Sequence, residues 1–263
     1  MAWLTVETFV VTTKPVDAYG GIRIPAEEIY KIADQLRLHG TARMKGHHDA
    51  RFPIRVQSIE VEVRPIGGDD LGVWMSAVVD EDDWNRIGGT RGFSIAVTEA
   101  LEEVGLTLPE IQVHADASWF ADDEIAEAVE ILRRDYRTHG SRLYQFSMWP
   151  PAKIVIEAGW SLVMALGPNL AASAVYDALK LLILKKRARG QARSFGEPTI
   201  IDMKIRNGPK EATAVIRTDD PETLRIAMTT FSNAVDRIVS ADSTDRGGAV
   251  WFDSESQEWR IVE

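Results

Sequence analysis

IRVQSIEVEVR, at residues 54–64, and LGVWMSAVV, at residues 71–79, are the two stretches that decide the fold. Apolar and polar residues alternate over most of the first stretch, which is the pattern of a strand with one buried face. The residues between them, Gly67 to Asp70, supply a tight turn before the second strand. The sequence therefore predicts a β-hairpin.

Strands and helices are both expected around this hairpin. Residues 2–12, AWLTVETFVVT, are rich in β-branched and aromatic residues and predict a strand that opens the fold. Pro25 stands at a helix start, and apolar residues recur behind it at helical spacing as far as Gly40. After the hairpin we expect an acidic helix over 80–87, a strand over 92–97, a helix over 98–104 and a strand over 110–116.

The strand at 110–116 has two chemically different faces. Because side chains alternate along a strand, Ile111 and Val113 face one way. Glu110, Gln112 and His114 share the other face. The sequence thus places three polar groups together, with the solvent side of an edge strand as the simple alternative to a functional face.

The rest of the chain continues with mixed elements. Residues 121–138 carry acids first and arginines last, which suits the dipole of a surface helix that ends at His139 and Gly140. Beyond them we expect a hairpin of 199–206 and 211–217, a helix from Asp220 to about Val239, and a final hairpin of 249–253 and 259–263.

An apolar segment at 154–187 ends in a basic run and raises the question of a membrane. Charged and proline residues interrupt it below the clean 18 to 20 residues that a spanning helix needs. A pair of helices broken at Gly167 and Pro168 is the favoured interpretation. Association of 154–187 with a membrane surface stays open as the alternative.

Composition restricts the function classes. The formal charge of −10 would repel phosphate backbones, so nucleic acid is not an expected partner. The absence of cysteine excludes disulfides, thiolate zinc sites and cysteine catalysis. Acids at 80–83 lack the spacing of a calcium loop. We expect no metal and no cofactor, and a cytoplasmic location because no signal-peptide pattern opens the chain.

Two domains are expected from the length of 263 residues and from a change of texture after Pro150 and Pro151. The first covers 1–145 and the second, smaller one covers 146–263. Both contain strands and helices, so the predicted class is α+β.

Several short motifs follow one another in a particular order over residues 10–130. They are Asp17 to Gly21, the helix after Pro25, His48-Asp49, Pro53-Ile54, the turn from Gly67 to Leu71, the acidic helix 80–87, Gly92-Phe93-Ser94-Ile95-Ala96, and Leu108 to His114. In order and spacing this half of the chain resembles the caudovirus prohead proteases, relatives of the herpesvirus assemblins. The resemblance implies a barrel-like, mostly antiparallel sheet with flanking helices.

The resemblance also implies a serine endopeptidase that cleaves a partner protein or itself. Ser94 would be the nucleophile and His48 the general base that takes its proton. Glu110 would be the third catalytic residue, with His114 as the backup, because assemblins use a second histidine on the corresponding strand. Ala96 and Gln112 depart from the family pattern near the oxyanion region.

A rival from another function class keeps the fold without the activity. In this interpretation the chain is a scaffold or adaptor that binds a partner protein in a bacterial or prophage defence or assembly system. The C-terminal half resembles, in composition, the small adaptor components of bacterial conflict systems. Self-association into a homo-oligomer is compatible with both interpretations.

Overall fold

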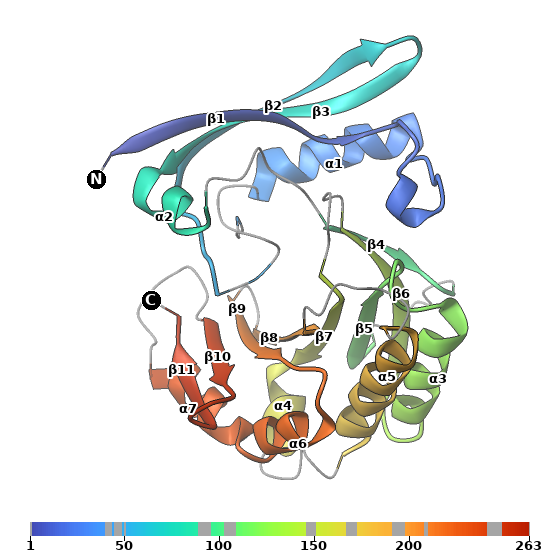
Figure 1. The fold of residues 1–263 in the computed structure, drawn as a ribbon, viewed down its shortest axis with the longest axis vertical. Helices are drawn as coiled ribbons and strands as arrows, with labels where there is room; N and C mark the ends of the chain where they lie inside the picture. Colours follow the sequence, from blue (N-terminus) through green and yellow to red (C-terminus); the bar gives the residue numbers. More distant parts are fainter. Residues whose placement is uncertain are drawn as a thin grey trace. The chain divides into compact units, whose positions relative to one another are not determined.

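The computed structural model shows an α+β protein with two sheets, which confirms the predicted class (Figure 1). The chain divides into two compact units, Met1–Val97 with Gln145–Pro150, and Thr98–Tyr144 with Pro151–Glu263. The residues that the structure describes are 2–39, 44, 49, 51–88, 96–102, 109–145, 151–166, 173–190, 198–207, 210–240 and 249–262.

The first unit holds a three-stranded antiparallel sheet in the order β1-β3-β2. Its strands are β1 (Trp3–Thr12), β2 (Val56–Gly67) and β3 (Asp70–Asp80). The predicted hairpin of β2 and β3 is confirmed, and Gly67 and Gly68 turn the chain with φ of 115° and 59°, a backbone region that favours glycine. The opening strand is confirmed as well.

Two helices and a short 3-10 turn, η1 (Asp17–Tyr19), accompany this sheet. α1 (Ala26–His39) buries Ile29 and Ala33 against Val73 and Met75 of β3. α2 (Glu81–Arg86) begins at Asp80, whose carboxylate accepts a hydrogen bond from the Asp83 backbone N–H. Both helices start where the sequence predicts them, because their capping and apolar spacing are local signals.

The second sheet has eight strands in the order β11-β10-β9-β8-β7-β5-β6-β4. Parallel pairs (β10-β9, β8-β7, β5-β6) occur between antiparallel ones, so the sheet is mixed. The strands are β4 (Ala96–Ala100), β5 (Ile111–Asp116), β6 (Thr138–Gln145), β7 (Lys153–Gly159), β8 (Ile200–Asn207), β9 (Lys210–Arg217), β10 (Ala249–Asp253) and β11 (Glu258–Ile261).

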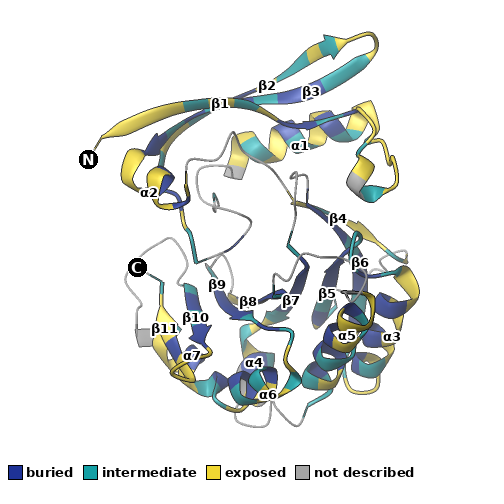
Figure 2. Cartoon of the chain, viewed as in Figure 1, coloured by how far each residue is buried: buried dark blue, intermediate teal, exposed yellow. Residues whose placement is uncertain are grey.

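Helices pack on one face of this sheet and bury the largest core of the chain (Figure 2). Ile111, Val113 and Ile154 contribute from the strands, and Leu179 and Leu182 from a helix. The helices are α3 (Asp122–Arg133), α4 (Trp160–Leu166), α5 (Ala174–Gly190), α6 (Pro221–Thr229) and α7 (Phe231–Ser240).

Two local expectations were wrong. Residues 96–100 form strand β4 where a helix was expected from 98, and the backbone N–H of Leu101 donates to the Gly140 carbonyl at 3.0 Å. The helix expected to reach 138 ends at Arg133, and the sequence after it forms β6. In each case pairing with a distant strand overrides the local preference.

The apolar segment at 154–187 is also corrected in part. Its beginning lies in strand β7, and only α4 and α5 are helical. Within the described ranges no helix is long and apolar enough to cross a membrane. Described apolar residues of this segment, such as Ile154, Leu179 and Leu182, instead belong to the core beneath the eight-stranded sheet.

Within the described residues both sheets are open, since each has two edge strands and neither closes into a barrel. The predicted boundary near residue 145 coincides with the end of β6. Strands from both sides of it pair with each other, because β5 is hydrogen-bonded to β7.

Candidate functional site

Of the four candidate catalytic residues predicted from the sequence, the structure describes two. Ser94 and His48 lie outside the described residues, so the structure gives no account of them. Glu110 is exposed just before β5, where its carboxylate accepts a hydrogen bond from the Arg137 backbone N–H at 2.9 Å. His114 is buried within β5, with 5% of its surface exposed. The described contacts therefore do not bring Glu110 and His114 together.

The two faces of β5 are those that alternation predicts. Ile111 and Val113 belong to the core under the helices, and His114 lies on the opposite face. The alternative of a solvent-facing edge strand is wrong for His114, because β5 lies between β6 and β7 and the imidazole is buried. We call this side of the eight-stranded sheet, opposite the helices, the polar face.

Glu157 of β7 is the centre of the polar face. Its Oε1 lies 2.9 Å from Lys204 Nζ and 3.8 Å from His114 Nε2. Its Oε2 lies 2.5 Å from Arg206 Nη2, which brings a second cation to the same carboxylate. Strand register explains the cluster, because Glu157 is directly opposite Lys204 on β8 and diagonal to His114 on β5.

These contacts fix the charges of the cluster. Burial lowers the pKa of His114 to about 4, and the nearby Lys204 and Arg206 act in the same direction although Glu157 opposes them. For Glu157, burial would raise the pKa, but Lys204, His114 and Arg206 together hold it below its usual value. At neutral pH the imidazole is therefore uncharged and the carboxylate is ionised.

A second ion pair lies on the same face. Lys153 Nζ of β7 lies 2.8 Å from Asp202 Oδ2 of β8, and the two residues are 6% and 1% exposed. A buried ammonium and a buried carboxylate each lose their hydration, and their pairing offsets part of that loss. The polar face thus contains two clusters of charged residues, and within each cluster the opposite charges pair with each other.

Some polar atoms of this face have no hydrogen-bond partner among the described residues. They are His114 Nδ1, His139 Nε2 and Asp202 Oδ1. The described part of the chain holds no group of three or more histidine, aspartate or glutamate residues arranged to ligate a metal ion.

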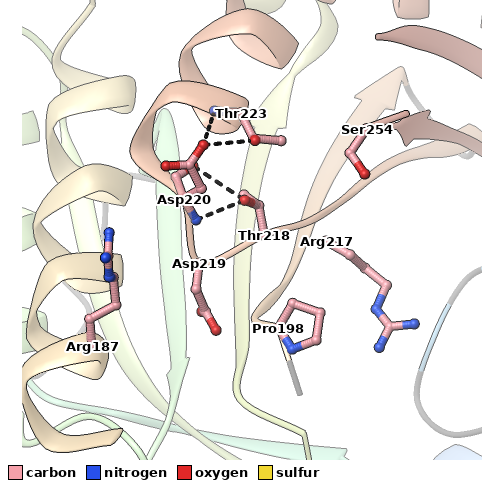
Figure 3. Close-up of a pocket in the computed structure, with 8 residues that line it drawn as sticks. All are labelled: Arg187, Pro198, Arg217, Thr218, Asp219, Asp220, Thr223 and Ser254. Atoms are coloured by element: carbon pink, nitrogen blue, oxygen red, sulfur yellow. Dashed lines mark hydrogen bonds between the residues drawn. The ribbon is translucent and has the colours of Figure 1, made fainter. Parts of the chain in front are cut away.

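A hollow of about 410 Å³ lies near the start of α6 (Figure 3). Its acids have structural partners: Asp220 caps α6 by accepting from the Thr223 backbone N–H at 2.8 Å. Asp219 accepts from Lys186 Nζ at 2.8 Å and from the Thr199 hydroxyl at 2.6 Å. These contacts fix the turn between β9 and α6, which accounts for both carboxylates.

Sequence reasoning did not identify Glu157, Lys153, Asp202 or Lys204. A signal was present, because KIVIEAG and TIIDMKIR are apolar strands interrupted at every second or fourth residue by a charge. Charges at even spacing in a central strand indicate a shared polar face. Their pairing partners depend on strand order, which the sequence did not reveal.

Comparison with known proteins finds no matching family model, no matching curated protein and no matching solved structure. The likeness to prohead proteases therefore stays an expectation from the sequence.

Proposed function

We propose that this chain is a noncatalytic scaffold or adaptor that binds a partner protein. The observation that carries the proposal is the pairing of buried charges on the polar face, where Glu157 lies 2.9 Å from Lys204 and Asp202 lies 2.8 Å from Lys153. Acid–base catalysis near neutral pH works best when the pKa of the catalytic group is near 7. The pKa of His114 is about 4 and that of Glu157 is held below its usual value, so neither group is suited to exchange protons there.

The arrangement of the charges supports the same function. Glu157 is shared by Lys204 and Arg206, and Asp202 is paired with the buried Lys153. Each pair joins β7 to β8, so the clusters connect neighbouring strands. Paired buried charges can specify which strands pair and in which register, as polar residues do in other proteins. A fixed sheet is what a scaffold needs in order to hold its surfaces in place.

A serine endopeptidase of the assemblin type is the second candidate, with Ser94 as nucleophile and His48 as base. One observation favours it: the Gly92 to Ala96 motif runs directly into strand β4, and the resemblance expects a strand here. Cleavage of a partner protein and a cytoplasmic location belong to this candidate as proposals.

A fluorophosphonate probe separates the two functions. Purified chain is incubated with the probe, and intact protein and peptides are analysed by mass spectrometry. Heat-denatured chain controls for nonspecific reaction, and an established serine hydrolase shows that the probe is active. A scaffold leaves Ser94 unlabelled.

Labelling at Ser94 that is lost in both Ser94→Ala and His48→Ala overturns the scaffold proposal, because only an activated hydroxyl reacts in this way. A variant of the polar face, Glu157→Gln, gives the matching control. For a scaffold it lowers stability without changing the probe reaction.

A further inference from the structure

In the described part of the chain, the edge strand β1 exposes large apolar side chains and has a free backbone edge, and the polar face accounts for neither. Among the described residues β1 has a strand neighbour on one side only, β3. Trp3, Leu4 and Phe9 are large apolar side chains exposed at 42%, 38% and 41%. Glu7 is the one charged residue between Trp3 and Thr12. Such an edge is open to pairing with another strand.

Natural edge strands are usually protected by lysine, by proline or by a bulge. β1 contains neither lysine nor proline. It does have an irregularity between Phe9 and Val11, where the register with β3 shifts. The segment from Trp3 to Phe9 is therefore a regular and unprotected edge of seven residues.

The hydrogen-bond pattern between β1 and β3 determines which backbone groups of β1 face the free edge. The Ala2 carbonyl accepts a hydrogen bond from the Glu81 N–H at 3.1 Å, so residue 2 bonds toward β3. Hydrogen-bonded positions alternate in an antiparallel ladder, so Leu4, Val6 and Thr8 also bond toward β3. The odd residues, from Trp3 to Phe9, then present their N–H and C=O groups at the free edge.

We propose that two copies of the chain dimerise by antiparallel pairing of their β1 strands about a two-fold axis at Val6. Outward-facing odd residues must pair with odd residues of the second copy. Among registers that pair at least three of the odd residues from Trp3 to Phe9, this condition leaves those centred on Thr5, on Val6 or on Glu7. Centring on Val6 pairs the whole regular segment, because Trp3 then lies opposite Phe9 and Thr5 lies opposite Glu7.

The other two registers give less favourable pairing between the strands. Centring on Glu7 sets two carboxylates directly opposite each other, which is destabilising, and extends past the irregularity. Centring on Thr5 sets Trp3 opposite Glu7 and leaves Phe9 without a partner inside the strand. In the Val6 register both Trp3–Phe9 pairs lie on the outer face, away from α1, where aromatic cross-strand pairs are stabilising.

A second copy fits the edge because it offers the same free N–H and C=O groups and the same aromatic residues, as a two-fold interface requires. The joined sheets would form one six-stranded sheet across the axis. This inference deepens the scaffold function, on which it rests, by naming one partner. A labelled Ser94 would remove that function and leave the dimer, whereas a monomeric chain would remove the dimer alone.

Sedimentation equilibrium of the full chain tests the association. The expected mass is twice the 29.3 kDa of one chain. Thr5→Pro removes an outward N–H without affecting a bond to β3, and should raise the dissociation constant at least about tenfold. Tyr30→Lys on α1, another exposed site, is the control and keeps the dimer. A monomer at every concentration overturns the proposal.

Single cysteines test the register, and the chain has no other cysteine to interfere. Val6→Cys places two thiols at a non-hydrogen-bonded pair, whose close Cα spacing suits a disulfide. Mild oxidation should link this variant into dimers, while Thr5→Cys and Glu7→Cys link much more slowly. Faster linking of either of those two variants overturns the Val6 register. Circular dichroism of each variant confirms that it is folded.

Discussion

The two sheets each bury one apolar side, but they differ in the side chains on the opposite side. The three-stranded sheet leaves Trp3 and Phe9 exposed on its outer side and buries an apolar inner side against α1. The eight-stranded sheet buries an apolar side under its helices and also buries charges, including Lys153 and Asp202, on the polar face. Its central strands therefore carry buried side chains on both sides, although one side is polar.

The difference shows where strand specificity comes from. In the three-stranded sheet the turn at Gly67 and Gly68 fixes the register of β2 with β3. In the eight-stranded sheet β5 and β7 are distant in sequence, and no turn can align them. Glu157 of β7 forms an ion pair with Lys204 of β8 and lies 3.8 Å from the neutral His114 of β5, so polar contacts align strands that no turn connects.

The largest effect should come from separating a buried ion pair. Asp202→Asn removes the negative charge that lies 2.8 Å from the buried Lys153 ammonium, and we expect a loss of about 3–5 kcal/mol in the free energy of unfolding. Urea denaturation followed by circular dichroism measures it. Replacing both partners, Lys153→Met with Asp202→Leu, should recover most of the loss. If Asp202→Asn costs nothing, the pair does not stabilise the sheet.

The pH dependence of stability should come next in size. The pKa of His114 is lowered to about 4 by burial, against 6.5 for an unfolded chain. Between these values only the unfolded state binds the proton, so stability falls as pH drops from 6.5 to about 4. The total is about 3 kcal/mol. His114→Asn should flatten this slope in urea titrations at stepped pH.

The neighbours of His114 define the control for this prediction. Glu157, Lys204, Arg206 and His139 all act on its charge. The pKa of Glu157 is held low, so this carboxylate contributes a separate loss of stability at lower pH, as its own proton is bound. Tyr30→Phe, at an exposed site in the other unit, should keep the slope of the wild type. An unchanged slope in His114→Asn contradicts the assignment.

These predictions rest on contacts that the sequence could indicate only in part. The hairpin of β2 and β3, the helix after Pro25 and the two faces of β5 depend on alternation, caps and turns, which are local. β6 was missed because His139 and Gly140 resemble a helix end. Gly140 is instead a close-packed strand residue, where an added Cβ would lie 2.7 Å from Val129 of α3.

The candidate site shows the same limit. The polar side of β5 was predicted, and His114 does lie on it. Its partner Glu157 could not be predicted, because β7 pairs with β5 rather than with β6, the strand that precedes it in the chain. Neighbours in the chain are often neighbours in a sheet, and the exception here decides which charges meet.

Substitution of one glycine in each sheet by alanine compares how tightly the two sheets are packed. Gly140→Ala forces a Cβ against Val129 between β6 and α3, and overpacking of this kind costs about 1–3 kcal/mol. Gly72→Ala in β3 also meets an atom at 2.7 Å, but it belongs to the exposed Phe9 ring, which can turn into solvent. We expect less than about 1 kcal/mol there. Equal losses in thermal unfolding would contradict the difference in packing.

The smallest effect should come from the outer side of the three-stranded sheet. Arg64 stacks on the Trp74 ring, 3.6 Å from its centroid, and its Nε lies 2.7 Å from Glu62. Both charged partners are exposed, so water screens the ion pair, while the stacking on Trp74 covers an apolar surface.

We therefore expect Arg64→Met to cost about 0.5–1 kcal/mol and Glu62→Gln to cost less, since the stacking remains in the second variant. Urea unfolding in low and high salt separates the two contributions. Salt should not change the loss in Arg64→Met if stacking dominates, because an apolar contact is not screened. A loss that disappears in high salt would assign the contact to the ion pair. The outer side of the first sheet would then use charge pairing as the polar face does, but in water, where pairing contributes far less.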